Sequence, residues 1–440
     1  MPRWRLASFP SVAHKLAMAE STDNQPPAWR AWAIWATGAA FFFYAFLQRM
    51  APSVMVPDLM RTFSVGASAL GGLSAFYFYA YMVVQLPTGL MTDRFGPRRL
   101  LTAAALISAL GGLAFAMADD LATAALGRLA VGAGAGFGFV CTLRIATDWF
   151  PAERMALLSG MTMMMGMAGG VFGQAPLSLL IGDFGWRPTM VGVALVAIVI
   201  AAGALLLTGG PRPARATGGA APTGIRRSLS GALGTGQTWI IAGYGFSIVT
   251  IMFAFGGLWG VPYLVQVHGL TRPDAAFAAS LILLGWGVFA PLVGWLSDRW
   301  RRRKPSMIAS AALALVTIVP VVYMPGLSSL AIKGLLFVNG VAVAGMVVCF
   351  ATVREHNDAS YAGTAMAFVN MAVIGAGAVM QPVTGWLLDL GWQGEVVAGA
   401  RVYSADAYRD AFIVLPISCV TALVLALSVR ETHARAKSPD

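Results

Sequence analysis

The feature that most constrains this chain is a series of twelve long apolar stretches. A helix needs about 20 predominantly apolar residues to cross the hydrocarbon core of a bilayer, and each stretch is about that long or longer. The stretches are continuous rather than alternating, which argues against a β-barrel. We therefore predict an all-α integral membrane protein with twelve transmembrane helices, within residues 32–57, 68–90, 100–118, 121–144, 155–182, 188–209, 238–266, 274–296, 306–325, 328–352, 361–388 and 410–429.

Composition supports a membrane protein. Of the 440 residues, 58% are hydrophobic and 11% are charged, whereas soluble domains carry about 25% charged residues. A chain this apolar cannot bury its hydrophobic residues in a water-soluble core. The lipid bilayer is therefore its expected surroundings.

The net charge of +11 is distributed as in a membrane protein rather than as a nucleic-acid-binding surface. If the amino terminus is cytoplasmic, 22 of the 30 lysines and arginines lie in cytoplasmic segments and five lie on the opposite side. This positive-inside bias sets orientation. We predict a multi-pass protein of the cell inner membrane, with both termini cytoplasmic and no nucleic-acid partner.

The polar segments divide the chain in two. The longest lies near the middle and is rich in Gly, Pro and Arg, as expected of a flexible linker. Translation could start at Met1 or Met18, and the first residues lack the pattern of a signal peptide. The predicted organisation is a tail at 1–31, a first bundle at 32–209, a linker at 210–237, a second bundle at 238–430 and a tail at 431–440.

A short motif occurs at the same place in each half. The second apolar stretch ends in Gly-Leu-Met-Thr-Asp-Arg-Phe-Gly-Pro-Arg-Arg at 89–99, and the eighth ends in Gly-Trp-Leu-Ser-Asp-Arg-Trp-Arg-Arg-Arg-Lys at 294–304. Such internal repeats are common in transporters. The first copy resembles the signature between spans two and three of the major facilitator superfamily. That resemblance covers about 32–430 and implies two pseudo-symmetric six-helix bundles around a central cavity, with a rocker-switch motion.

The motif residues are predicted to gate the cytoplasmic side. Asp93 ends span two where span eleven begins, so the positive helix end of span eleven is available to it. Asp298 would act in the same way on the start of span five. Gly89 would allow a close helix approach. The predicted gating residues are Gly89, Asp93, Arg94, Gly96, Arg98, Arg99, Asp148, Glu153, Gly294, Asp298 and Arg299, with the arginines of 94–99 pairing Asp148 and Glu153.

Arg49 in span one is the leading candidate for substrate binding. The stretch 43–59 is similar to the first span of the organophosphate antiporters, whose arginine eight residues before a proline binds substrate phosphate; Arg49 and Pro57 have that spacing. Those antiporters carry a second arginine in span seven, where this chain has Ala254, and a histidine in span five that is absent here. The departure favours a monoanion such as a carboxylate over a phosphate. The alternative is an arginine that extends to the membrane surface.

Two further basic residues lie within spans. Arg128 stands in Gly-Arg-Leu-Ala-Val-Gly-Ala-Gly (127–134), which resembles the span-four motif R-x-x-x-G-x-G of the superfamily; the resemblance implies a cavity-facing arginine that assists proton coupling. Lys333 lies in span ten and is also a candidate for the cavity lining. The alternative interpretation is a lysine that extends to the periplasmic rim of the membrane. All 19 acidic residues lie in loops or near span ends. Because charges inside a membrane usually mark function, we predict an anionic or zwitterionic small-molecule substrate.

Polar residues in other spans are also candidates for the cavity lining. Tyr77, Tyr81 and Gln85 follow a four-residue spacing and therefore share one helix face. Buried hydroxyls and amides need partners, which makes Asn370 and Gln381 of span eleven comparable candidates.

We therefore predict a secondary active transporter of an organic acid, amino acid or phosphate ester that works by alternating access, with a proton as one candidate coupling ion. Segments 353–371 and 389–409 resemble the sugar-phosphate-permease-like branch of bacterial members. The alternatives are a drug or metabolite efflux antiporter and a transporter-like ligand sensor. The sequence offers no nucleophile–base pair, metal-ligand cluster or phosphate loop, so we predict no enzymatic activity, no cofactor and no metal.

Overall fold

The computed structural model describes residues 28–207 and 225–434. Within them, twelve helical segments are long and apolar enough to cross a membrane. The predicted all-α fold with twelve spans is therefore confirmed. Met18 and the rest of 1–27, residues 208–224 of the predicted linker, and 435–440 lie outside the described residues.

Six spans form the first bundle. Spans one, four and five are each built from more than one helix, because their regular hydrogen bonding changes part-way along. The elements are α2 (Ala28–Met50), η1 (Ala51–Val54), α3 (Val56–Phe63), α4 (Ala67–Phe95), α5 (Pro97–Met117), α6 (Leu121–Ala135), α7 (Gly138–Trp149), η2 (Ala152–Arg154), α8 (Met155–Phe172), α9 (Ala175–Phe184) and α10 (Trp186–Leu207).

The other six spans form the second bundle, and a short helix and a two-stranded antiparallel hairpin accompany them. The elements are α11 (Ile225–Gly234), α12 (Gly236–Thr250), η3 (Ile251–Trp259), α13 (Gly260–His268), α14 (Arg272–Trp300), α15 (Lys304–Tyr323), α16 (Ser329–Val343), η4 (Ala344–Met346), α17 (Val347–His356), α18 (Ala362–Leu390), β1 (Val396–Val397), β2 (Ala400–Arg401), α19 (Ala405–Ala411) and α20 (Val414–Ser428).

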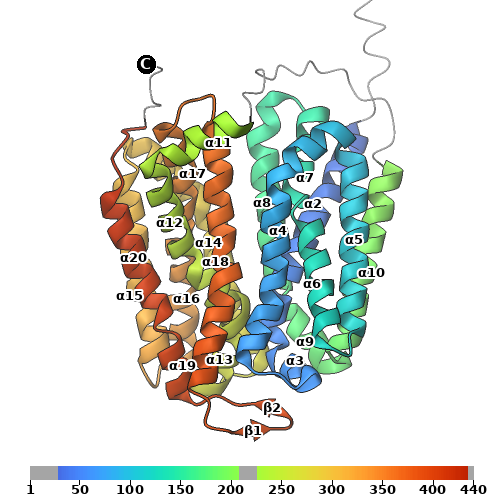
Figure 1. The fold of residues 1–440 in the computed structure, drawn as a ribbon, viewed down its shortest axis with the longest axis vertical. Coiled ribbons are helices and arrows are strands. Elements are labelled where there is room, and N and C mark those ends of the chain that lie inside the picture. Colours follow the sequence, from blue (N-terminus) through green and yellow to red (C-terminus); the bar gives the residue numbers. More distant parts are fainter. Residues whose placement is uncertain (1–27, 208–224, 435–440) are drawn as a thin grey trace, which may run out of the picture.

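The two bundles stand side by side (Figure 1). They meet where α4 packs along α18 and where α14 packs against α8 and α9. The described chain on both sides of 208–224 lies at one end of the molecule, which we call the linker end. The β1–β2 hairpin lies at the other, which we call the hairpin end (Figure 1).

Small residues allow the helices to approach closely enough to assemble the centre of the first bundle. A Cβ on Gly132 of α6 would lie 2.1 Å from the carbonyl oxygen of Tyr77 in α4, a distance that no real side chain tolerates. Lipid-embedded helices associate largely through such close packing. Gly132 lies one helical turn from Arg128, so this contact brings Arg128 and Tyr77 into one neighbourhood.

Span seven is irregular. Its middle, η3, is a nine-residue π-helix whose residues are all buried. The i→i+5 hydrogen bonding of a π-helix is rare and occurs often at functional sites. In a π-helix the carbonyl groups accept from the residue five positions further along the chain rather than four. Side chains of neighbouring spans contact two of these carbonyls, as described below.

Two segments differ from the prediction. Part of the predicted flexible linker is the helix α11, where Ala232 is buried and Gly231 lies against the ring of Tyr361. The amphipathic sequence of α11 explains its packing onto the second bundle. The predicted loop at 389–409 contains the β1–β2 hairpin, which turns through Ala398 and Gly399, both at positive φ.

Candidate functional site

Arg49 is buried among aromatic rings. It lies near the end of α2 and is 2% exposed. The central carbon of its guanidinium group lies 4.2 Å from the ring centre of Phe46, 5.0 Å from that of Tyr81 and 6.0 Å from that of Phe253. Phe253 belongs to the second bundle, so Arg49 lies at the interface between the bundles.

Arg128 lies next to Arg49 through a shared aromatic ring. Its guanidinium carbon is 5.1 Å from the ring centre of Tyr77, and that of Arg49 is 5.5 Å from the same centre. The Tyr77 hydroxyl donates to the carbonyl of Ala45 at 2.9 Å, which fixes the ring. Arg128 Nη1 donates to the carbonyl of Gln48 at 2.8 Å. The structure therefore brings Arg49, Arg128 and Tyr77 together, although they come from three spans. We call these three residues the central cluster.

The same edge of each guanidinium group has no partner. In both Arg49 and Arg128, Nε and Nη2 are buried and make no hydrogen bond in the described part of the chain. These two atoms form the side edge of the planar group, which fits the two oxygens of a carboxylate or phosphate. The central cluster thus presents two buried donor edges, each with the geometry to pair with an oxyanion.

Within residues 28–207 and 225–434, no acidic residue neutralises these two arginines in the way that Asp274 neutralises Lys333. Every Asp and Glu of 28–207 and 225–434 lies in a loop or close to a helix end. Lys333 lies near the start of α16, where its Nζ is 3.2 Å from a carboxylate oxygen of Asp274 in the first turn of α14. The prediction grouped Lys333 with the arginines as a cation without a counter-charge, and this pairing corrects that interpretation.

The other predicted lining residues lie along α4 and α18. Tyr81 stacks with Tyr77 at 6.2 Å between ring centres. Gln381 is fully buried and donates from Nε2 to the carbonyl of Phe253 at 2.9 Å, which places it beside the central cluster. Gln85, whose Oε1 is buried without a partner, and half-buried Asn370 lie nearer the linker end.

Several polar contacts that join the two bundles lie at the hairpin end. Asp389, at the end of α18, accepts hydrogen bonds from the backbone N–H groups of Ala67 at 3.1 Å and Ser68 at 2.8 Å, where α4 begins. The hydroxyl of Tyr403 donates to Asp389 at 2.6 Å. Burial and the adjacent carboxylate raise the pKa of Tyr403 above its ordinary value, so that hydroxyl remains a donor.

A second polar contact closes the same end. Arg272, at the start of α14, forms an ion pair with Asp58 of α3 and also donates to the carbonyl of Val54. Beside this pair is a cavity of about 300 Å³ between α3, α13 and the hairpin, with Arg61 and Arg401 among its lining residues. Its walls belong to both bundles, so separation of the bundles at this end would divide it.

At the linker end, the first copy of the motif forms contacts inside its own bundle. Asp93, with 67% of its side chain exposed, is paired with Arg144 at 3.1 Å, and Arg144 also contacts Asp148 at 3.2 Å. Arg98 donates to the carbonyl of Leu205. Asp148 is thus paired with Arg144, whereas the prediction paired it with the arginines of 94–99.

The remaining motif residues of the first bundle are mostly exposed. Arg94 lies over the ring of Phe95, while Arg99 and Glu153 are exposed. Among the residues that the structure describes, nothing lies within 4 Å of a Cβ built on Gly89, so the close helix approach predicted there does not occur in this conformation. Gly96 has a φ of 78° between α4 and α5, a conformation that favours glycine.

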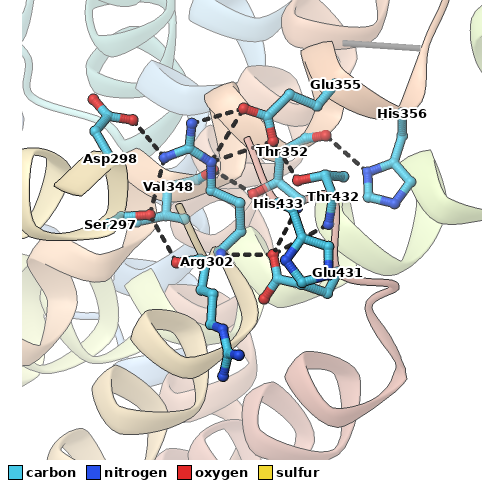
Figure 2. Close-up of polar contacts among 11 residues, drawn as sticks. Ser297, Asp298, Arg302, Val348, Thr352, Glu355, His356, Glu431, Thr432 and His433 are labelled. Atoms are coloured by element: carbon cyan, nitrogen blue, oxygen red, sulfur yellow. Dashed lines mark hydrogen bonds and ion pairs between the residues drawn. The ribbon is translucent and has the colours of Figure 1, made fainter. Parts of the chain in front are cut away.

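The second copy of the motif is more deeply packed. Arg303, between α14 and α15, is 3.1 Å from Glu355 through Nε, 2.7 Å from it through Nη2, and 2.5 Å from Asp298 through Nη1. Asp298 and Glu355 both point toward this turn (Figure 2). Burial alone would lower the pKa of the Arg303 guanidinium, but Glu355 and Asp298 raise it above its ordinary value.

The chain after α20 returns to the same turn. Glu431 accepts from the backbone N–H of Arg303 at 2.8 Å and of Lys304 at 3.0 Å, and thereby caps α15. Thr432 donates to Glu355 (Figure 2). Although burial alone would raise its pKa, these backbone donors hold the pKa of Glu431 below its ordinary value. In the second copy, a Cβ built on Gly294 would lie 3.9 Å from the side chain of Val347, and Arg299 is exposed.

Several of these residues were not predicted. Arg144, Arg303 and Glu355 are charged residues near span ends, and the sequence pattern does not separate them from neighbouring charges that only set orientation. Gln174 was not among the predicted site residues either. A polar residue repeated at equivalent points of spans five and eleven was the available signal, since Gln174 and Gln381 each precede a proline closely.

Comparison with known proteins agrees with this architecture. The profile of the Major Facilitator Superfamily matches residues 37–373 and, in an overlapping match, 241–440. The chain belongs to the Major Facilitator Superfamily. A solved structure of a bacterial homologue of the human lysosomal transporter Spinster, inward-facing and unoccupied, shares the fold with a TM-score of 0.76 and 16% identity, over 94% of this chain and 100% of that chain.

Two curated relatives have a higher sequence identity to this chain than the Spinster homologue has. A probable sulfoacetate transporter of Cupriavidus necator is 25% identical over 157 residues, which span 36% of each chain. A probable hexose phosphate transport protein of Chlamydia pneumoniae is 25% identical over 405 residues, 84% of this chain and 88% of that protein.

Proposed function

We propose that this chain is a secondary active transporter that moves a small anionic or zwitterionic metabolite across the inner membrane by alternating access. The observation that carries the proposal is the pair of buried guanidinium edges on Arg49 and Arg128. The substrate would be an organic acid, an amino acid or a phosphate ester.

The energetic cost of these arginines supports an anionic substrate. An arginine at mid-membrane costs roughly 2.5–3.5 kcal/mol on insertion scales, and such residues usually serve function. A buried donor without an acceptor adds about 1–3 kcal/mol. Aromatic rings around Arg49 offset part of this cost through cation–π attraction, but they leave the hydrogen-bonding edge vacant. An oxyanion would satisfy both the charge and the edge.

The charge distribution supports the orientation. By the positive-inside rule, the linker end faces the cytoplasm and the hairpin end faces the periplasm, with both termini cytoplasmic. The contacts of Asp389 and Arg272 then close the periplasmic side, and the central cluster belongs to a state directed toward the cytoplasm. Outward opening would break these contacts.

The motif residues would form the opposite gate. In the alternate state, Asp93 would leave Arg144 and contact the amino-terminal end of α18. In the same way, Asp298 would leave Arg303 and contact the amino-terminal end of α8. The proposed gating residues are those predicted from the sequence, with Arg144, Arg303 and Glu355 added. The names of two relatives, which mention a hexose phosphate and sulfoacetate, also fit an anionic cargo.

Replacement of Arg49 tests the proposal. Arg49→Ala removes one bidentate, charge-assisted contact, and hydrogen bonds to charged groups contribute about 1.5–3 kcal/mol each. We expect at least a ~100-fold loss of affinity. The measurement is ligand-induced thermal stabilisation of purified protein against organic acids, amino acids and phosphate esters, followed by uptake into proteoliposomes.

Lys333→Ala is the matched control, because Lys333 is also a cation within a span but is already paired with Asp274. We expect this variant to keep its affinity. Equal stabilisation of Arg49→Ala and wild type by the same acid would reject the assignment of Arg49. A ligand that binds but is not taken up would instead indicate the sensor-like alternative.

A further inference from the structure

Two buried glutamines occupy equivalent places in the two bundles. Gln174 lies at the break between α8 and α9 in span five, and Gln381 lies in α18, which is span eleven. Each is in the fifth span of its bundle and each is fully buried. They come from opposite bundles, yet both contact the π-helix η3 of span seven.

The contacts fix the orientation of both side-chain amides. Gln174 Nε2 donates to the carbonyl of Gly256 at 2.5 Å and Gln381 Nε2 donates to the carbonyl of Phe253 at 2.9 Å. A flipped amide would place its oxygen against a carbonyl oxygen, which is repulsive, so the network assigns the nitrogen to each contact. The amide oxygens must therefore face elsewhere.

Both amide oxygens lack a donor. Oε1 of Gln174 and Oε1 of Gln381 are buried and accept no hydrogen bond in the described part of the chain. Buried polar atoms are nearly always paired, and an exception calls for an explanation such as a missing ligand or water. The carbonyls of Phe253 and Gly256 in η3 explain why the nitrogens are held here. They do not explain the vacant oxygens.

Gln381 is linked to Arg49 through Phe253. Gln174 lies near the residues that follow Arg49 in the chain, since its Nε2 donates to the hydroxyl of Ser53 at 3.4 Å. Phe253 accepts from Gln381 through its carbonyl and contacts Arg49 through its ring, whose centre is 6.0 Å from the guanidinium carbon. A Cβ on Gly257 would lie 3.1 Å from Gln381 Nε2 and 3.7 Å from the sulfur of Met50, the neighbour of Arg49. Both glutamines therefore contact residues that pack against Arg49 or follow it closely in the chain.

We propose that Gln174 and Gln381 form an acceptor pair that recognises a hydroxyl or ammonium group on the substrate. This inference rests on the proposed transport of an anion, and it narrows the class to hydroxy acids and amino acids. The arginine edges bind the oxyanion while the amide oxygens accept hydrogen bonds from the neighbouring donor. A plain carboxylic acid of the same size leaves the two oxygens unpaired.

Matched series of acids test the inference on the full chain. The probes are propionate, lactate and alanine, together with succinate, malate and aspartate. Within each series the compounds share a carbon skeleton and differ by one donor group. A site built to hydrogen-bond such a group discriminates strongly against the analogue that lacks it. We expect a hydroxy or amino acid to bind wild type at least ~10-fold more tightly than its parent, measured by titration calorimetry and competition.

Gln174→Met and Gln381→Met retain the side-chain length and remove the amide. We expect each variant to lose most of the preference while the dissociation constant of the parent acid stays within about threefold of wild type. The matched control is Asn339→Leu. Asn339 is a buried amide that also has a vacant oxygen, but it donates to Ala314 and Thr317 inside the second bundle. This variant should keep the preference.

The outcomes separate the two proposals. Parent acids that bind as tightly as their hydroxy and amino derivatives overturn the acceptor pair and leave the anionic substrate intact. Glutamine variants that retain the wild-type preference, or an Asn339→Leu variant that loses it equally, also overturn the pair. If none of the six acids binds wild type, the acceptor pair is overturned. The anionic-substrate proposal fails as well only if the phosphate esters of the first screen also do not bind.

Discussion

Arg303 should be the most stabilising charge at the linker end. Its side chain is 6% exposed, and that of its partner Glu355 is 11% exposed, whereas Asp298 is 68% exposed. Arg303→Met would leave Glu355 charged and nearly buried without its bidentate partner. Removal of one member of a buried pair costs 3–5 kcal/mol. Because Thr432 still donates to Glu355, we expect about 3 kcal/mol, the lower limit of that range.

A double-mutant cycle isolates this interaction. Replacing both partners with apolar residues of similar volume is often neutral, so the Arg303→Met, Glu355→Met double variant should recover much of the loss. The assay is the free energy of unfolding of purified protein in mixed micelles. Arg302→Met is the control, since Arg302 is exposed and its loss should cost less than about 0.5 kcal/mol. The reasoning is refuted if Arg303→Met costs no more than Arg302→Met.

Two further predictions concern the ends of the molecule. Asp389→Asn puts an amide where a carboxylate accepts two backbone N–H groups, so the hairpin end should open more often. The measurement uses a cysteine in place of buried Ser53, with the native cysteines replaced. In the Asp389→Asn background this cysteine should react several times faster with an impermeant maleimide, and an unchanged rate would contradict the prediction. The pKa of the Glu431 carboxyl is depressed, so its contribution to stability is complete above its ordinary value of about 4.5 and is lost as the pH falls through the lower folded value. Wild type should therefore lose stability in that acid range while Glu431→Gln changes less, as measured by unfolding titrations across pH; parallel curves for the two proteins would refute it.

The sequence alone determined the twelve spans and much of the chemistry. Transfer of about 20 apolar residues into lipid is favourable whatever the neighbouring helices do, so span number is a local property. The repeated motif could be found in the same way. Arg49 and Arg128 could be identified as interior cations because no acidic residue lies near them in the chain, and charge burial is costly in any packing.

Tertiary structure decided which polar residues meet. Lys333 is paired with Asp274, 59 positions away, and Gln174 contacts Gly256 across 82 positions and across the bundle interface. Arg303 is buried while Arg302 beside it is exposed. Each outcome depends on the rotation of a helix about its axis and on the apposition of two bundles. Packing between distant segments sets both the rotation and the apposition, so neither can be predicted from the local order of residues.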